Sequence, residues 1–203
     1  MLEQIPMHKI NINPYSTITR ATTMPYTHIS SSIPEITDFV VVDTETTGLN
    51  GEYDRIVELS AVKFKNNQPI AIFETLINPE CNIPYNTIRV HGITNEMVKD
   101  APTIAQVIED FDQFLEDLPI IGHNLLFDLK FIHYSGSTIL QNHTFYCTYR
   151  IASKRIPKPY PIQNHKLGTL CNYYNIQNNN QHRAYADAYA TGILFKKLQK
   201  DCF

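Results

Sequence analysis

Closely spaced cysteines and long apolar runs are both missing from this sequence of 203 residues. The four cysteines are Cys81, Cys147, Cys171 and Cys202, and no two of them have CxxC spacing. This argues against a zinc site and a disulfide framework and fits a reducing compartment. No apolar run approaches the roughly 20 residues that a membrane-spanning helix needs. The N-terminal MLEQIPMHKININP lacks the apolar core of a secretory signal. We therefore expect a soluble, cytoplasmic protein with one globular domain.

Acidic residues are also missing from one segment, which lies between Asp128 and Asp187. The net charge of −3 hides this asymmetry, because 17 of the 20 acidic residues lie from Glu35 to Asp128. A basic segment can neutralise phosphates even in a protein that is acidic overall. The alternative is that these cations only solvate loops. The acid-free segment contains Lys130, Arg150, Lys154, Arg155, Lys158, Lys166 and Arg183, of which Lys154, Arg155 and Lys158 are our candidate substrate contacts.

The order of the predicted elements indicates an α/β fold. Apolar or alternating runs predict strands at 38–43, 55–65, 70–77, 119–123 and 143–147. A capping box predicts a helix that opens at Thr103, and further helices are expected from Asn124, at 166–174 and at 184–200. Three antiparallel strands followed by strands alternating with helices predict a mixed five-stranded sheet flanked by helices. Residues 1–36 lack periodicity, so we expect an extension that is flexible or lies on the surface of a domain at 37–203.

Two carboxylates, Asp43 and Glu45, come at the end of the first predicted strand. Residues two apart on a strand project from the same face. Their mutual repulsion is costly unless a cation lies between them, and hard oxygen ligands suit Mg²⁺ or Mn²⁺. A lone Asp-x-Glu more often caps a turn, so this pair is weak evidence on its own.

Three further candidates lie later in the chain. Asp128 falls near the start of the helix from Asn124, at a strand-to-helix junction where sites of α/β sheets gather. Taken alone, it is better explained as a favourable acid near a helix N-terminus. His182 and Asp187 are five apart, which is about 140° around a helix, so they would not share a face of one helix. We therefore predict that His182 lies in the preceding loop and Asp187 in the first turns of the last helix.

The segments FVVVDTETTGL, IIGHNLLFD and HRAYAD contain these five residues in order. With VHGIT and Leu167-x-Thr169-Leu170-Cys171, they resemble the DnaQ-like, DEDDh class of 3′→5′ exonucleases over about residues 38–198. The strongest likeness is to the proofreading epsilon subunit of bacterial DNA polymerase III and related stand-alone exonucleases. The resemblance implies a ribonuclease H-like exonuclease fold.

The resemblance also implies roles for the five residues. Asp43, Glu45, Asp128 and Asp187 would hold two divalent cations, Mg²⁺ or Mn²⁺, and His182 would be the general base toward the attacking water. The products would be a nucleoside 5′-monophosphate and a shortened 3′-OH end.

Five other residues are candidate substrate contacts. Thr46, Thr47 and Leu49 could touch the terminal nucleotide through backbone N–H groups and an apolar wedge, although the threonines could equally form the turn. In related enzymes the positions of His91 and Asn124 lie beside the substrate strand. The adjacent histidine, His123, could instead be a packed residue at a strand end.

Three functions are compatible with this family resemblance: a DNA exonuclease, an exoribonuclease and an inactive interaction module. We favour a DNA exonuclease over an exoribonuclease that trims RNA ends, because HRA-x-x-DA and VHGIT resemble the epsilon subunit. An inactive interaction module is disfavoured, since none of the five residues is missing. The sequence stops at Phe203 without a long C-terminal tail, so a stand-alone enzyme is favoured over a polymerase-bound one.

Overall fold

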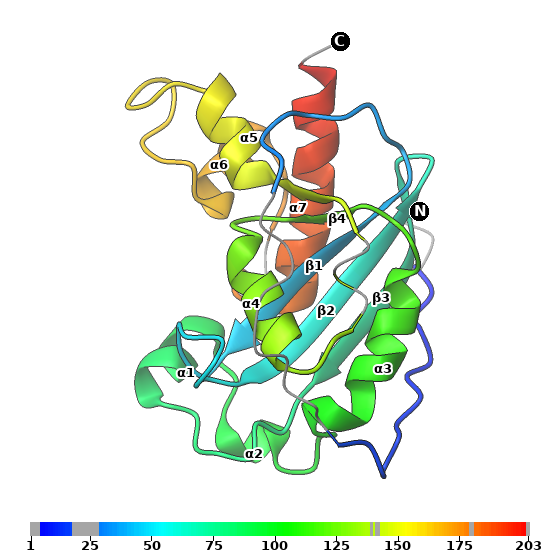
Figure 1. Ribbon diagram of the computed structural model, residues 1–203. Coiled ribbons are helices and arrows are strands. Elements are labelled where there is room, and N and C mark those ends of the chain that lie inside the picture. Colours follow the sequence, from blue (N-terminus) through cyan, green and yellow to red (C-terminus); the bar gives the residue numbers. More distant parts are fainter. Residues whose placement is uncertain (1–4, 18–28, 139, 141–142, 179–180, 202–203) are drawn as a thin grey trace.

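A mixed five-stranded sheet forms the centre of the computed structural model, which describes residues 5–17, 29–138, 140, 143–178 and 181–201 (Figure 1). The strand order is β3-β2-β1-β4-β5. The first two pairs, β1–β2 and β2–β3, are antiparallel, whereas β1–β4 and β4–β5 are parallel. This confirms the predicted fold. The strands are β1 (Phe39–Thr46), β2 (Ile56–Lys65), β3 (Gln68–Leu76), β4 (Ile120–Gly122) and β5 (Phe145–Cys147).

The long hairpin β2–β3 turns at Asn66 and Asn67, as predicted for residues 66–68. Both residues have positive φ angles, 50° and 60°. Asparagine tolerates this left-handed conformation better than most residues, and it suits a two-residue hairpin turn whose twist matches the strands. The hairpin places β2 beside β1, where Glu45 pairs with Glu58.

Helices cover both faces of the sheet (Figure 1). On one face, α3 (Ile104–Leu115) and α4 (Leu126–Tyr134) pack in a core that includes Val40 and Val42. On the other, α5 (Thr148–Arg155), α6 (Leu167–Tyr173) and α7 (Ala184–Lys200) share a core with Val41. Because side chains alternate along a strand, the odd-numbered residues of β1, including Asp43 and Glu45, face α7.

The last helix approaches the sheet very closely at Gly192. A Cβ atom added there would lie 2.4 Å from the ring of Phe64 on β2. A larger residue would push the helix off the strand. The glycine therefore lets α7 lie directly on β2 and fixes the height of this helix above the sheet.

The helix boundaries confirm some predictions and correct others. The capping box at Thr103 is present, and α7 has the predicted bounds. Asn124 is not the N-cap of α4: it has a φ of 62°, and the N-cap is Leu125. The left-handed turn at Asn124 delays the helix by one residue. Three short helices were not predicted: α1 (Tyr85–His91), α2 (Asn95–Val98) and α5.

Two parts of the N-terminal region lie against the edges of the sheet. His8 N–H donates to Ile72 O at 2.6 Å on β3, and Ser30 N–H donates to Phe145 O at 2.8 Å on β5. His8 also pairs with Asp110 of α3, with 3.0 Å between Nε2 and Oδ2. In the described parts of residues 1–36, backbone bonds therefore connect the chain to both outer strands. Residues 1–4 and 18–28 lie outside the described part.

Among the described helices, none is long and apolar enough to cross a membrane.

Candidate active site

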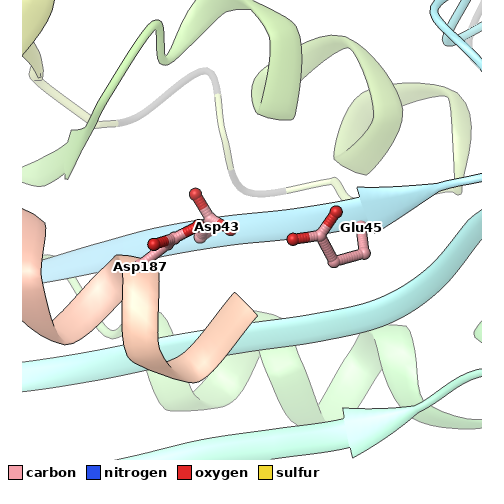
Figure 2. A group of neighbouring side chains, drawn as sticks. All are labelled: Asp43, Glu45 and Asp187. Carbon is pink, nitrogen blue, oxygen red and sulfur yellow. The ribbon is translucent and has the colours of Figure 1, made fainter. Parts of the chain in front are cut away.

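Three carboxylates meet where β1 passes the start of α7. Asp43 and Glu45 come from β1, and Asp187 comes from the first turn of α7. One oxygen from each residue can be chosen so that all three lie within 4.8 Å of one another. Figure 2 shows Asp43 and Asp187 side by side, with the carboxylate of Glu45 turned toward them. We call these three residues the carboxylate cluster.

The three acids of the carboxylate cluster have raised pKa values or raise those of their neighbours. Burial raises the pKa of Glu45 from 4.5 to about 8, and the charge of Asp187 adds to this effect. Burial, followed by the charge of Asp128, also raises the pKa of Asp43 well above its ordinary value. Converging carboxylates disfavour one another's ionised form unless a cation compensates. Oxygen ligands at this separation suit a divalent ion such as Mg²⁺ or Mn²⁺.

Asp128 approaches β1 from the opposite face of the sheet and is not one of the three residues whose oxygens lie within 4.8 Å of one another. It lies in the first turn of α4 and is buried, and its Oδ1 accepts hydrogen bonds from the N–H of Thr44 at 3.0 Å and from its hydroxyl at 2.9 Å. Burial raises the pKa of Asp128 to about 7, while the bonds from Thr44 oppose this effect. Its charge is close enough to raise the pKa of Asp43. Asp128 is therefore bonded to β1 through Thr44, the residue between Asp43 and Glu45.

His182 lies in the loop immediately before α7, as its spacing from Asp187 predicted. Its φ is 64°, and its side chain is exposed. The His182 N–H donates to Asp187 Oδ2 at 3.0 Å, and the amide of Asn178 donates to Oδ1 at 2.6 Å. The left-handed turn thus folds the chain back so that His182 and Asp187 lie together without sharing a helix face.

A fifth acid, Glu58 on β2, was not among the residues predicted from the sequence. It is fully buried and binds the guanidinium of Arg183 and the N–H of Ala184. The only signal in the sequence was a glutamate within an apolar strand. In a strand of alternating polar and apolar residues, such a glutamate is read as a side chain that faces solvent. Its importance depends on the packing of α7, which the sequence did not show.

The turn after β1 uses both of its threonines internally. Thr46 Oγ1 donates to Gly48 O at 2.6 Å, and Thr47 Oγ1 accepts from Arg55 N–H at 2.9 Å. The N–H of Thr47 donates to Arg55 O at 2.8 Å. These bonds are those of turn-forming residues. By contrast, the side chain of Leu49 is 86% exposed.

The two histidines near the site differ in their surroundings. His91 ends α1 and is buried; its Nδ1 accepts from Ile93 N–H at 3.0 Å, and burial lowers its pKa. His123 lies 2.9 Å from Thr148 Oγ1 through its Nδ1, and burial lowers its pKa to about 4. His123 is therefore a packed, neutral residue at the strand end, whereas Asn124 beside it is exposed.

The basic candidates are separate from the carboxylate cluster. Lys154 and Arg155 lie in the last turn of α5, Lys158 follows in the loop, and all three are exposed. Arg155 lines a cavity with Leu198, near the far end of α7. At 1.5 Å per residue, Leu198 is about 16 Å along the helix from Asp187. The structure therefore does not bring these cations to the cluster.

Comparisons with known proteins agree with this geometry. The family RNase_T, described as exonuclease, matches residues 40–195. The PolC-type DNA polymerase III of Oceanobacillus iheyensis is 39% identical over 163 residues, which are 79% of this chain and 11% of that protein. The Bacillus subtilis protein of the same name is 36% identical over 167 residues, covering 80% of this chain and 11% of the relative. The chain thus spans about a tenth of the length of these relatives.

Solved structures share the fold. Exonuclease X in complex with 5′-overhanging duplex DNA has a TM-score of 0.64 at 24% identity, covering 80% of this chain and 92% of that one. Escherichia coli exonuclease I with a dT13 oligonucleotide has a TM-score of 0.67 at 18% identity, covering 81% of this chain and 41% of that one. The match over residues 40–195 includes the carboxylate cluster, Asp128 and His182. The chain therefore belongs to the RNase_T exonuclease family.

Proposed function

We propose that this chain is a metal-dependent 3′→5′ exonuclease that releases nucleoside 5′-monophosphates from DNA 3′ ends. The observation that carries the proposal is the carboxylate cluster, whose oxygens lie within 4.8 Å of one another on the strand and helix of an exonuclease-family fold. DNA is favoured as substrate because the relatives at 36–39% identity are DNA polymerases by name. Their names also suggest a polymerase as partner, which co-purification with the full replication complex would test.

The residues divide the chemistry between them. Asp43, Glu45, Asp128 and Asp187 would hold two divalent cations, Mg²⁺ or Mn²⁺. Such ions, when bound, lower the pKa of a water and stabilise the leaving oxygen of an in-line displacement at phosphorus. His182 would be the general base that accepts the proton of the attacking water; its side chain is exposed and its backbone N–H bonds to Asp187, which supports this role.

The surrounding residues would position the strand. Leu49 would contact the base of the terminal nucleotide, and His91 and Asn124 would lie along the strand. Thr46 and Thr47 stay candidate contacts by resemblance alone, because both are buried and their hydroxyls bond within the turn. Lys154, Arg155 and Lys158 would contact phosphates several nucleotides from the 3′ end. Residues 37–203 would form the exonuclease domain, with residues 1–36 as its extension.

The test is the digestion of matched DNA and RNA strands, single and double, each labelled at the 5′ end. The proposal expects a ladder that shortens from the 3′ end of DNA, with 5′-monophosphates as products. Ethylenediaminetetraacetate (EDTA) should stop the reaction, and Mg²⁺ or Mn²⁺ should restore it. Asp117→Asn is the control for Asp43→Asn, because Asp117 is an exposed acid after α3. Digestion that continues in EDTA contradicts the proposal, as does digestion of the RNA strands but not of the DNA strands.

A further inference from the structure

The buried acid Glu58 lies directly beside the carboxylate cluster without belonging to it. On the antiparallel β1–β2 pair it stands opposite Glu45, so both side chains project from the face that α7 covers. Like charges directly opposite one another destabilise a sheet. A buried carboxylate at this position therefore needs a compensating contact, and two residues of the α7 start provide it.

The first contact is an ion pair with Arg183. The guanidinium donates through Nε to Oε1 of Glu58 at 3.0 Å and to Oε2 at 3.2 Å, and through Nη2 to Oε1 at 2.5 Å. A forked guanidinium fixes the direction of its partner as well as its distance, because its donors are rigid and planar. The ion pair thus constrains the orientation of the Arg183 side chain relative to β2.

The second contact is a helix cap supplied from another strand. The N-cap residue of α7, Arg183, makes no side-chain capping bond, and the N–H of Ala184 donates instead to Glu58 Oε2 at 2.8 Å. The first N–H groups of a helix have no partner within the helix, and a carboxylate there also interacts favourably with the helix dipole. One carboxylate therefore binds the last residue of the loop and the first of the helix.

These contacts surround the part of the chain that carries the chemistry. His182 precedes Arg183, and its N–H bonds to Asp187, which follows three residues after Ala184. Farther along, the close approach of Gly192 to Phe64 fixes the helix on β2. With the middle of α7 held there, the bonds to Glu58 connect its first turn to β2 as well. Rotation of that turn would move His182 and Asp187 relative to β1.

We propose that Glu58 and Arg183 are positioning residues that hold His182 and Asp187 in register with Asp43 and Glu45. The inference rests on the proposed exonuclease function and goes beyond it by assigning roles to two residues outside the metal-holding set. Partners that orient metal ligands typically contribute about 10- to 100-fold in metal affinity or activity.

The main variant is Glu58→Gln, which keeps the volume and removes the charge. The control is Glu74→Gln on β3: Glu74 pairs with Ser60, so it lies on the same face of the sheet and is another acid near Arg183. Both variants remove one negative charge from this face, but only Glu58 bonds to the start of α7. We expect Glu58→Gln to lower kcat about 10- to 100-fold with KM within about twofold, and Glu74→Gln to leave kcat unchanged.

Mn²⁺ binding, measured by isothermal titration calorimetry without substrate, gives a readout that does not depend on activity. The proposal expects an affinity about 10-fold weaker for Glu58→Gln than for wild type and Glu74→Gln. A folded Glu58→Gln with wild-type kcat and Mn²⁺ affinity overturns the proposal, as does an equal loss in Glu74→Gln. If wild type digests no strand, the proposed function fails, while the Mn²⁺ comparison still tests the positioning.

Arg183 provides the second route if Glu58→Gln does not fold. Its side chain is 39% exposed, so substitutions there are better tolerated than at Glu58. Arg183→Met removes the ion pair, and Arg183→Lys restores the charge without the fork. We expect kcat to fall in the order wild type, Arg183→Lys, Arg183→Met at constant KM. Equal kcat values for all three overturn the proposal.

Discussion

Removing the charge of Glu45 should stabilise the metal-free protein. Burial raises the pKa of Glu45 from 4.5 to about 8. The folded state therefore holds this proton more tightly than the unfolded chain, and the stability falls as the pH rises from about 4.5 to about 8. At about 1.4 kcal/mol for each pH unit, the loss at pH 7 has an upper limit of about 3 kcal/mol. Because Glu45 is partly exposed, we expect Glu45→Gln to recover about 1–3 kcal/mol at pH 7.

The assay is urea unfolding in EDTA, followed by circular dichroism from pH 4 to 8.5. Glu45→Gln should be more stable than wild type at pH 7, and the difference should shrink as the pH falls toward 4, because below about 4.5 the wild-type carboxyl becomes protonated in both the folded and the unfolded state. Added Mn²⁺ should stabilise wild type more than the variant, because ligand binding to the folded state alone adds stability. Glu109→Gln, an exposed site on α3, is the control. A variant less stable than wild type at pH 7 in EDTA, or a pH-independent difference, would refute the reasoning.

Three further predictions concern other parts of the chain. Asp43→Asn should abolish digestion while the circular dichroism spectrum and the melting temperature show a folded protein; an active variant contradicts the metal assignment. Replacing Lys154, Arg155 and Lys158 together by glutamine should weaken binding of single-stranded DNA in a filter or fluorescence titration and flatten its salt dependence by about 0.7 for each lost phosphate contact; an unchanged slope would show that these side chains are only solvated. Gly192→Ala adds a Cβ against a buried ring of β2 and should cost about 1–3 kcal/mol in urea unfolding; wild-type stability would show that α7 can shift.

The sequence predicted the parts of the fold that local patterns control. Alternating apolar residues and the Asn66–Asn67 turn indicated the β2–β3 hairpin, and the capping box indicated α3. The short helices α1 and α5 were missed because neither begins with a side-chain cap, and seven or eight residues give little periodicity. Asn124 was misassigned because the same residue type suits both an N-cap and a left-handed turn.

The candidate site was predictable in its residue types but not in its support. Spacing placed His182 in a loop and Asp187 on a helix, as the structure has them. Three supporting contacts depend on how distant segments pack: the bond from Asn178 to Asp187, the bonds from Thr44 to Asp128 and the ion pair between Arg183 and Glu58. A single sequence contains no signal for such pairs. The basic segment is spread out in space: Arg183 binds Glu58 beside the cluster, whereas Arg155 lies near Leu198 at the far end of α7, and a role for Lys154, Arg155 and Lys158 in substrate binding stays a prediction.

The bridges that Met7 and Ser30 make to the two outer strands have a consequence for how the protein can be shortened. An outer strand with unpaired N–H and C=O groups is a template for joining strands of another molecule. A fragment that starts at residue 37 would keep all five strands but uncover part of β3 and part of β5 at once. Such a fragment should self-associate through these two strands, so the N-terminal region would act as a built-in guard against aggregation.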